Sequence, residues 1–480
     1  MASTVRLTAP GVLVGAVRTP PPSGPTKRTV RFPTELWVLC FIVSLGAVQS
    51  IPLGFYQFRL SDLILDLGVL YCARVHIRGR LTMRIRVLLA AYITTLIGRI
   101  LYESLSVEPE SMRTLLGMGA AYAAPFIFFA VREAQASRRL LWTLLFLACV
   151  ISLLSQMGLL GYGESYAAGA IDLSRFLGIA RRTSLELDYV EATITIWRAL
   201  SVGLTLAAVV ARTGFVVKAF GVVGFVLQFT GGGGSRSQLL FLILAPLLMF
   251  LRPGRRGTWK NVVRLPVALA TAGLFAVVYL WAPVKGDGLV KGVSAISHYD
   301  RATEIVTVFT GGRTAAAETS GGGFDGRVSG WETYWTGIMT GPKVFWFGTG
   351  LSFGAAFRDT ANILAHNPIL DVWALSGLIG LVFFLCFVAL VVLDLRLLLS
   401  VTPRGGADEL IGLSVAGAIM YMFQWLFFQA VTADRSFMIV FYLLSGLMLP
   451  TTRLLAYRVS QRSGQQPVMV RPTLRGVAAG

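Results

Sequence analysis

Long apolar runs separated by short polar segments dominate the sequence. A membrane-spanning helix needs about 20 mainly apolar residues. Runs of roughly that length predict about twelve spans, at 36–53, 59–74, 87–104, 114–131, 140–160, 192–211, 214–230, 237–251, 265–283, 376–395, 409–430 and 437–456. Asp62 and Asp66 interrupt the second run, and the seventh and eighth runs are short. The pattern predicts an all-α polytopic membrane protein.

The basic residues between the runs alternate with the predicted spans. Cytoplasmic connections carry an excess of Lys and Arg. With residues 1–35 placed in the cytoplasm, every strongly basic short connection falls on the same side: the second-to-third, fourth-to-fifth and eighth-to-ninth connections and the tail 457–480. The first 34 residues lack the form of a cleavable signal peptide. We therefore predict a multi-pass protein with both termini in the cytoplasm.

Two connections on the outer side are long. Residues 161–191 form a loop of medium length between spans, and residues 284–367 form the largest loop, which separates nine spans over 36–283 from three over 368–456. The large loop has seven Lys and Arg against seven Asp and Glu. Loops this long are uncommon unless they have a structural or functional role. We expect the large loop to contribute to a site.

Composition supports the membrane assignment. The chain is 55% hydrophobic and 14% charged, whereas a soluble domain carries about 25% charged residues. The net charge of +19 is spread over the short connections rather than gathered in one patch, so nucleic-acid binding is not expected. The four cysteines lie inside apolar runs without metal-binding spacing, so neither a zinc site nor a disulfide framework is indicated.

A Gly-rich turn between the seventh and eighth runs is the first candidate site. Four glycines, Gly231–Gly234, precede Ser235, Arg236 and Ser237. Exposed backbone N–H groups at a helix start favour an anion, and an arginine fork suits phosphate. The alternative is a flexible hairpin whose arginine reaches the lipid head groups.

The large loop supplies the other candidates. Arg327 and Trp331 are four residues apart, which places them on one helix face, and the tryptophan could stack on a sugar or belong to an interfacial aromatic belt. His366 and Asn367 stand where the loop re-enters the membrane, and a histidine there could act as a general base or have only a structural role. Further candidate substrate-binding residues are Arg181, Arg182 and Arg301.

Taken in order, these segments resemble the O-antigen ligase and O-antigen polymerase family of bacterial membrane glycosyltransferases. The resemblance covers about 221–395 and rests on the helix-opening Ser235–Ser237, the loop arginine Arg327, and a spaced pattern of short motifs. That pattern is Gly348-Thr-Gly350-Leu351, then His366-Asn367-Pro368, then Gly377-Leu378-Ile379-Gly380. The remaining spans agree only in number and topology.

The resemblance implies a GT-C-like fold with a partly helical periplasmic loop, in the bacterial inner membrane. It implies transfer of a glycan from a polyprenyl diphosphate to an acceptor hydroxyl at the outer face, without metal or cofactor. His366 would act on the acceptor, and Arg236 and Arg327 would hold the diphosphate. The lipid bilayer, a carrier-linked donor and a glycan or lipid-linked acceptor are the expected partners, with a flippase and a chain-length regulator as candidate protein partners.

Several alternatives stay open at this point. Polymerisation is slightly favoured over ligation to lipid A core, because nothing in the sequence marks a lipid A acceptor. A transporter or flippase of lipid-linked glycans would also suit twelve spans and arginines within them. A peptidoglycan-type polymerase shares the general layout. It would need a catalytic acid on the large loop, for which Asp300, Asp325 and Glu332 are candidates without a supporting motif.

Overall fold

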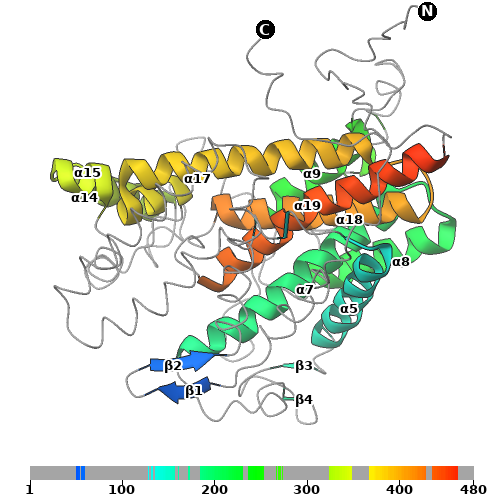
Figure 1. Cartoon of the computed structure of the whole chain (residues 1–480), viewed down its shortest axis with the longest axis horizontal. Helices are drawn as coiled ribbons and strands as arrows, with labels where there is room; N and C mark the ends of the chain where they lie inside the picture. The colour runs from blue at the N-terminus through cyan, green and yellow to red at the C-terminus, as the bar shows by residue number, and fades with distance from the viewer. Residues whose placement is uncertain are drawn as a thin grey trace, which may run out of the picture.

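The computed structural model describes thirteen helices and strands and a few single helical positions (Figure 1). The described residues are 50–53, 56–59, 128, 131–132, 136–156, 160–161, 171–172, 184–230, 236–252, 266, 269–271, 273, 324–348, 367–428 and 435–462. Every structural statement below concerns these residues.

Most of the described chain is helical. The helices are α5 (Arg138–Gln156), α7 (Ser184–Val210), α8 (Phe215–Thr230), α9 (Arg236–Leu251), α14 (Phe324–Ile338), α15 (Pro342–Phe347), α17 (Pro368–Val401), α18 (Ala407–Phe428) and α19 (Arg435–Arg462). The antiparallel strands β1 (Ser50–Leu53) and β2 (Tyr56–Arg59) form a hairpin, and β3 (Leu160–Gly161) pairs in parallel with β4 (Ile171–Asp172).

The helices form a bundle in which α18 and α19 lie between α17 and α7 (Figure 1). α5 and α8 pack on α7, and α9 packs on α18. α17 extends past the bundle at its N-terminal end, where α14 and α15 pack against it (Figure 1). One large core joins the bundle helices, and a smaller cluster joins α14 to the start of α17.

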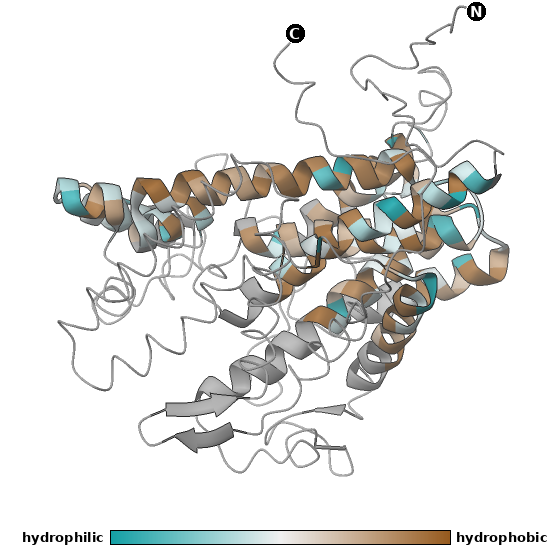
Figure 2. Cartoon of the chain, in the orientation of Figure 1, coloured by the Kyte–Doolittle hydropathy of each residue, from teal (hydrophilic) through white to brown (hydrophobic). Residues whose placement is uncertain are grey.

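α17 is apolar on both of its faces. Its bundle face is buried and includes Leu381, Phe384 and Val391, whereas Val382, Leu385 and Val392 on the other face are exposed. The helix is hydrophobic along most of its length (Figure 2). An apolar helix whose outer face is also apolar is typical of a membrane span, because lipid takes the place of water on that face.

Three described helices are long and apolar enough to cross a membrane: Ser376–Val401, Ala407–Leu426 and Val440–Gln461. Shorter apolar helical stretches occur at Ile196–Val210 and Phe215–Gly224. The described part of the chain is therefore that of a helical membrane protein.

Small residues allow α7 and α18 to cross closely. Gly203 of α7 and Gly417 of α18 face each other, and a Cβ added to Gly417 would lie 2.9 Å from the Gly203 Cα. Small residues recur every four positions along α7, at Ala199, Gly203 and Ala207. Such repeats let helix backbones approach in membranes, where dispersion and backbone contacts replace the hydrophobic effect between helices.

The fifth to eighth and tenth to twelfth predicted spans each coincide with a described helix, namely α5, α7, α8, α9, α17, α18 and α19. The other five predicted spans lie wholly or largely outside the described residues. The described residues are mainly helical, as predicted, but β1 occupies the last four residues of the predicted first span. Pro52 lacks a backbone N–H and disfavours a helix at this position.

Candidate functional site

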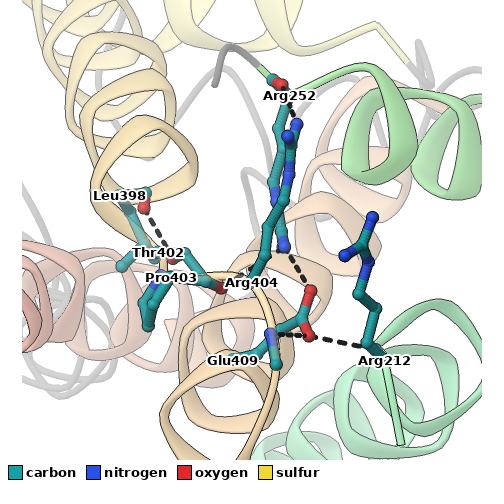
Figure 3. A network of polar contacts seen from close by, with 8 residues as sticks. Arg212, Arg252, Leu398, Thr402, Pro403, Arg404 and Glu409 are labelled. Carbon is teal, nitrogen blue, oxygen red and sulfur yellow. Dashed lines mark hydrogen bonds and ion pairs between the residues drawn. The ribbon is translucent and has the colours of Figure 1, made fainter. Parts of the chain in front are cut away.

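A buried ion pair joins four segments at one end of the bundle (Figure 3). The Arg252 guanidinium, at the end of α9, contacts the Glu409 carboxylate in the first turn of α18, and both side chains are buried. The second Glu409 oxygen accepts hydrogen bonds from the backbone N–H groups of Arg212 (2.9 Å) and Gly405 (2.6 Å). Arg252 also donates to the Pro403 carbonyl at 3.4 Å.

Two further ionic groups lie at the same end. Arg132 forms a bidentate pair with Asp394, with nitrogen–oxygen distances of 2.9 and 3.0 Å, and both residues are buried. The Asp408 carboxylate forms an ion pair with Arg458, with a nitrogen–oxygen distance of 3.1 Å, and its oxygen lies 3.7 Å from Nε of Arg138. A buried charge is tolerated only when it is paired and hydrogen-bonded. These arginines and acids therefore neutralise one another inside the protein.

The ion pairs bring together the connections that the sequence predicts on the basic side. The start of α5, the ends of α7, α9 and α19, and the α17–α18 turn all meet there. The predicted alternation of spans agrees with this geometry. Which side of a membrane this end faces stays a prediction.

At the opposite end, α14 and α15 are joined to the first turns of α17. Tyr334 and Ile338 of α14 are buried against Leu370 and Ala374 of α17, and Trp331 packs on this cluster. The Trp335 ring meets Trp373 edge-on, with centroids 5.6 Å apart.

α15 packs directly against Gly377 of α17. This glycine has a left-handed backbone with φ of +69°, inside α17, and a Cβ built there would overlap the Trp346 carbonyl oxygen. Trp373 Nε1 donates to the Phe345 carbonyl at 3.0 Å, and α15 ends at Gly348, whose φ is +71°. Two glycines of the spaced sequence pattern thus shape one contact. Sequence reasoning places Gly377 at a helix start. α17 begins at Pro368, but its backbone is non-helical and kinked at Gly377, so a new helical segment begins there.

Asn367 fixes the start of α17. Its side-chain oxygen accepts from the backbone N–H groups of Ile369 (3.0 Å) and Leu370 (3.5 Å), and Pro368 follows as the first helical residue. This is an ordinary N-cap, which stabilises a helix by about 1 kcal/mol. The substrate-binding role predicted for Asn367 therefore has a structural alternative.

The predicted arginines are placed by their helices. Arg327 lies in α14, one turn before Trp331, and Arg236 and Ser237 are the first residues of α9. The structure describes the backbone of these three residues but not their side chains. Ser235, His366, Arg181, Arg182 and Arg301 lie outside the described residues. The structure thus joins the helix of Arg327 to the cap that follows His366.

α9 is shorter than the apolar part of α17. Arg252, directly after α9, and Pro403, just after α17, lie close together. α9 has 16 residues, or about 24 Å at 1.5 Å per residue. The apolar part of α17 has 26 residues, or about 39 Å. α9 is therefore shorter by about 15 Å, and Arg236 is its first residue.

The Gly377 contact carries a testable consequence. We expect Gly377→Ala to detach α15 from α17, because the added methyl meets backbone and the left-handed φ costs about 1–2 kcal/mol for alanine. Hydrogen exchange followed by mass spectrometry should show faster exchange over 342–348 and 368–376. Gly341→Ala, where the new methyl meets nothing within 4 Å, is the control. Equal exchange in both variants would show that the packing of α15 on α17 does not depend on Gly377.

Taken together, the bundle, its apolar outer faces and its buried ion pairs define a helical membrane protein. The chain matches no known protein family, and no curated protein is similar to it in sequence.

Proposed function

We propose that the protein is a membrane glycosyltransferase. It transfers or polymerises a glycan from a polyprenyl-diphosphate-linked donor onto a sugar hydroxyl at the outer face of the bacterial inner membrane, without a metal ion. His366 deprotonates or positions the acceptor hydroxyl, and Arg236 and Arg327 stabilise the negative charge that develops on the departing diphosphate.

One observation carries the proposal. α14, which holds Arg327 and Trp331, packs against the first turns of α17, whose cap Asn367 directly follows His366. This packing of α14 on α17 supports a site to which Arg327, Trp331 and His366 contribute in our proposal. Trp331 is half-buried on that cluster, and a rigid aromatic platform of this kind suits a sugar ring.

The ion pairs at the other end agree with this location. Arg132 and Arg252 are each engaged by a buried carboxylate, so their charge is compensated within the protein. A diphosphate needs cations whose charge is available to it. Because α9 is about 15 Å shorter than the apolar part of α17, the proposal requires a water-filled recess between α9 and the outer part of α17.

The proposal predicts the effect of two single substitutions in cells. His366→Ala and Arg236→Ala should each abolish the polymer that the wild-type gene restores to a deletion strain, because each removes a group needed in the transition state. Glycan length and amount are measured by gel electrophoresis of extracted surface polysaccharide. Thr336→Ala, on the exposed face of α14, is the matched control. Normal polymer from well-expressed His366→Ala and Arg236→Ala proteins would refute the assignment.

Polymerisation is favoured over ligation within this proposal, because no feature of the chain marks a lipid A acceptor. A polymerase lengthens the carrier-linked glycan, whereas a ligase moves it to the lipid A core. Lipid A core extracted from the deletion strain distinguishes the two functions: loss of a ligase leaves the core unsubstituted, whereas loss of a polymerase leaves it carrying a single repeat.

A further inference from the structure

α14 presents three different surfaces around its circumference. Tyr334 and Ile338 are buried against α17. Trp335 and, directly after the helix, Met339 are exposed, and the other exposed positions between 332 and 340 are polar, namely Glu332, Thr333, Thr336 and Thr340. At about 100° per residue, Trp335 and Met339 lie on one flank of the buried face and Thr333 on the opposite flank, with Glu332 and Thr336 on the outer side between them. The apolar surface of α14 therefore extends from its buried face onto one flank.

α15 and the first turn of α17 continue the exposed apolar surface. Trp346 and Phe347 are 48% and 49% exposed, and Ile369 is 41% exposed. With Trp335 and Met339 they make five large apolar side chains on a unit of only a few turns. We call these five residues the aromatic rim.

Packing fixes the level of the aromatic rim along the membrane normal. The Trp346 carbonyl lies against Gly377, and Gly377 is the second residue of the apolar span Ser376–Val401. α15 is therefore level with the first turn of a membrane-spanning helix. Trp373, which meets Trp335, is only three residues before that span.

Tryptophan at this level has a specific preference. Its indole ring is apolar with one N–H donor, and it concentrates at the boundary between hydrocarbon and head groups. A helix with an apolar side and a polar side at the same level lies in the interface plane with its polar side toward water. Both the chemistry and the depth of the rim match this environment.

We infer that the α14–α15 unit is an interfacial membrane-binding element, whose aromatic rim is immersed in the head-group and upper acyl region of the bilayer around the start of α17. The occupant of this surface is lipid. The element anchors the large loop at a fixed height, independently of the reaction that the protein catalyses.

Spin-label accessibility in lipid vesicles tests this inference. The full-length protein, with its four cysteines replaced by alanine, carries one new cysteine at a time: Met339→Cys, Trp346→Cys, or Thr333→Cys as the control on the polar side of α14. Each protein is checked for a single monodisperse peak in detergent, labelled with a nitroxide, and reconstituted in phosphatidylethanolamine–phosphatidylglycerol vesicles. Collisions with oxygen, which concentrates in hydrocarbon, are compared with collisions with a water-soluble nickel chelate.

The inference predicts that oxygen collisions dominate at positions 339 and 346 and nickel collisions dominate at position 333. Nickel collisions at 339 and 346 equal to those at 333 would show that the rim faces water. Low collision rates with both reagents at 339 and 346 would show that protein covers the rim, from this chain or a second copy. Either of these results would overturn the inference, and neither depends on catalytic activity.

Discussion

Glu409→Ala is expected to destabilise the protein strongly. The Glu409 side chain is buried, contacts Arg252, and accepts backbone N–H groups from the α7–α8 connection and the α17–α18 turn. Its removal leaves the Arg252 charge buried without its carboxylate and two backbone donors without their acceptor. Breaking one side of a buried ion pair costs about 3–5 kcal/mol.

The measurement is the thermal unfolding midpoint of the purified protein in detergent, together with its yield from membranes. Glu332→Ala is the matched control, because Glu332 is exposed on α14 and its loss should leave the midpoint unchanged. Glu409→Gln, which keeps the shape and one acceptor oxygen, should fall between the two. If Glu409→Ala and Glu332→Ala unfold at the same temperature, the ion pair does not hold this end of the bundle together.

Gly203→Ala is expected to weaken the protein through the α7–α18 crossing. A Cβ at Gly203 would overlap the Ser414 carbonyl and lie 2.6 Å from the Ala418 nitrogen, and both of these atoms are backbone of α18. Neither can move aside without shifting a whole helix. Overpacking of this kind typically costs about 1–3 kcal/mol, and it opposes the gain of about 1 kcal/mol that alanine usually brings to a helix.

Gly214→Ala adds the same methyl group where nothing lies within 4 Å. We expect Gly214→Ala to leave the unfolding midpoint unchanged or slightly raised, and Gly203→Ala to lower it clearly. The comparison is made in one detergent with both proteins purified in parallel. A Gly203→Ala protein as stable as Gly214→Ala would contradict the close crossing of α7 and α18.

Much of the helical framework is predictable from the sequence. Apolar runs locate α5, α7, α8, α9, α17, α18 and α19, because a span must satisfy its backbone within itself and bury no charge without a partner. The alternation of basic connections predicts that the ends of α9 and α17 lie together, and Arg252 and Pro403 meet there.

The buried ion pairs are not predictable in the same way. The connections that contain Arg132 and Arg252 are predicted to be cytoplasmic from their basic residues. In the structure, both residues are buried. Their partners, Asp394 and Glu409, are 262 and 157 residues away in the chain. No local pattern identifies such pairs, although an acid near the end of an apolar run, as at Asp394, is a reason to look for a partner.

The candidate site was predicted in part. The sequence pattern selects Gly348, Asn367 and Gly377, but it does not reveal that Asn367 caps a helix or that Gly377 receives the α15 backbone. The role of Gly377 depends on a contact with Trp346 from a separate segment of the chain, whereas the cap at Asn367 is a local contact with Ile369. The aromatic rim could not be predicted from the sequence either, because tryptophans in a loop can face water, lipid or protein. Its proposed environment follows from the contact between Trp346 and Gly377 at the start of an apolar span.

The most direct test of the proposed function is transfer by the purified protein. The wild-type protein in vesicles, supplied with a polyprenyl-diphosphate-linked repeat and no nucleotide sugar, should form longer carrier-linked glycan and release polyprenyl diphosphate in equal amounts, with EDTA present. The His366→Ala and Arg236→Ala proteins should form neither product, while the Thr336→Ala protein retains activity. Absence of both products from wild-type protein that moves the intact lipid-linked repeat across the bilayer would contradict a glycosyltransferase and indicate a flippase.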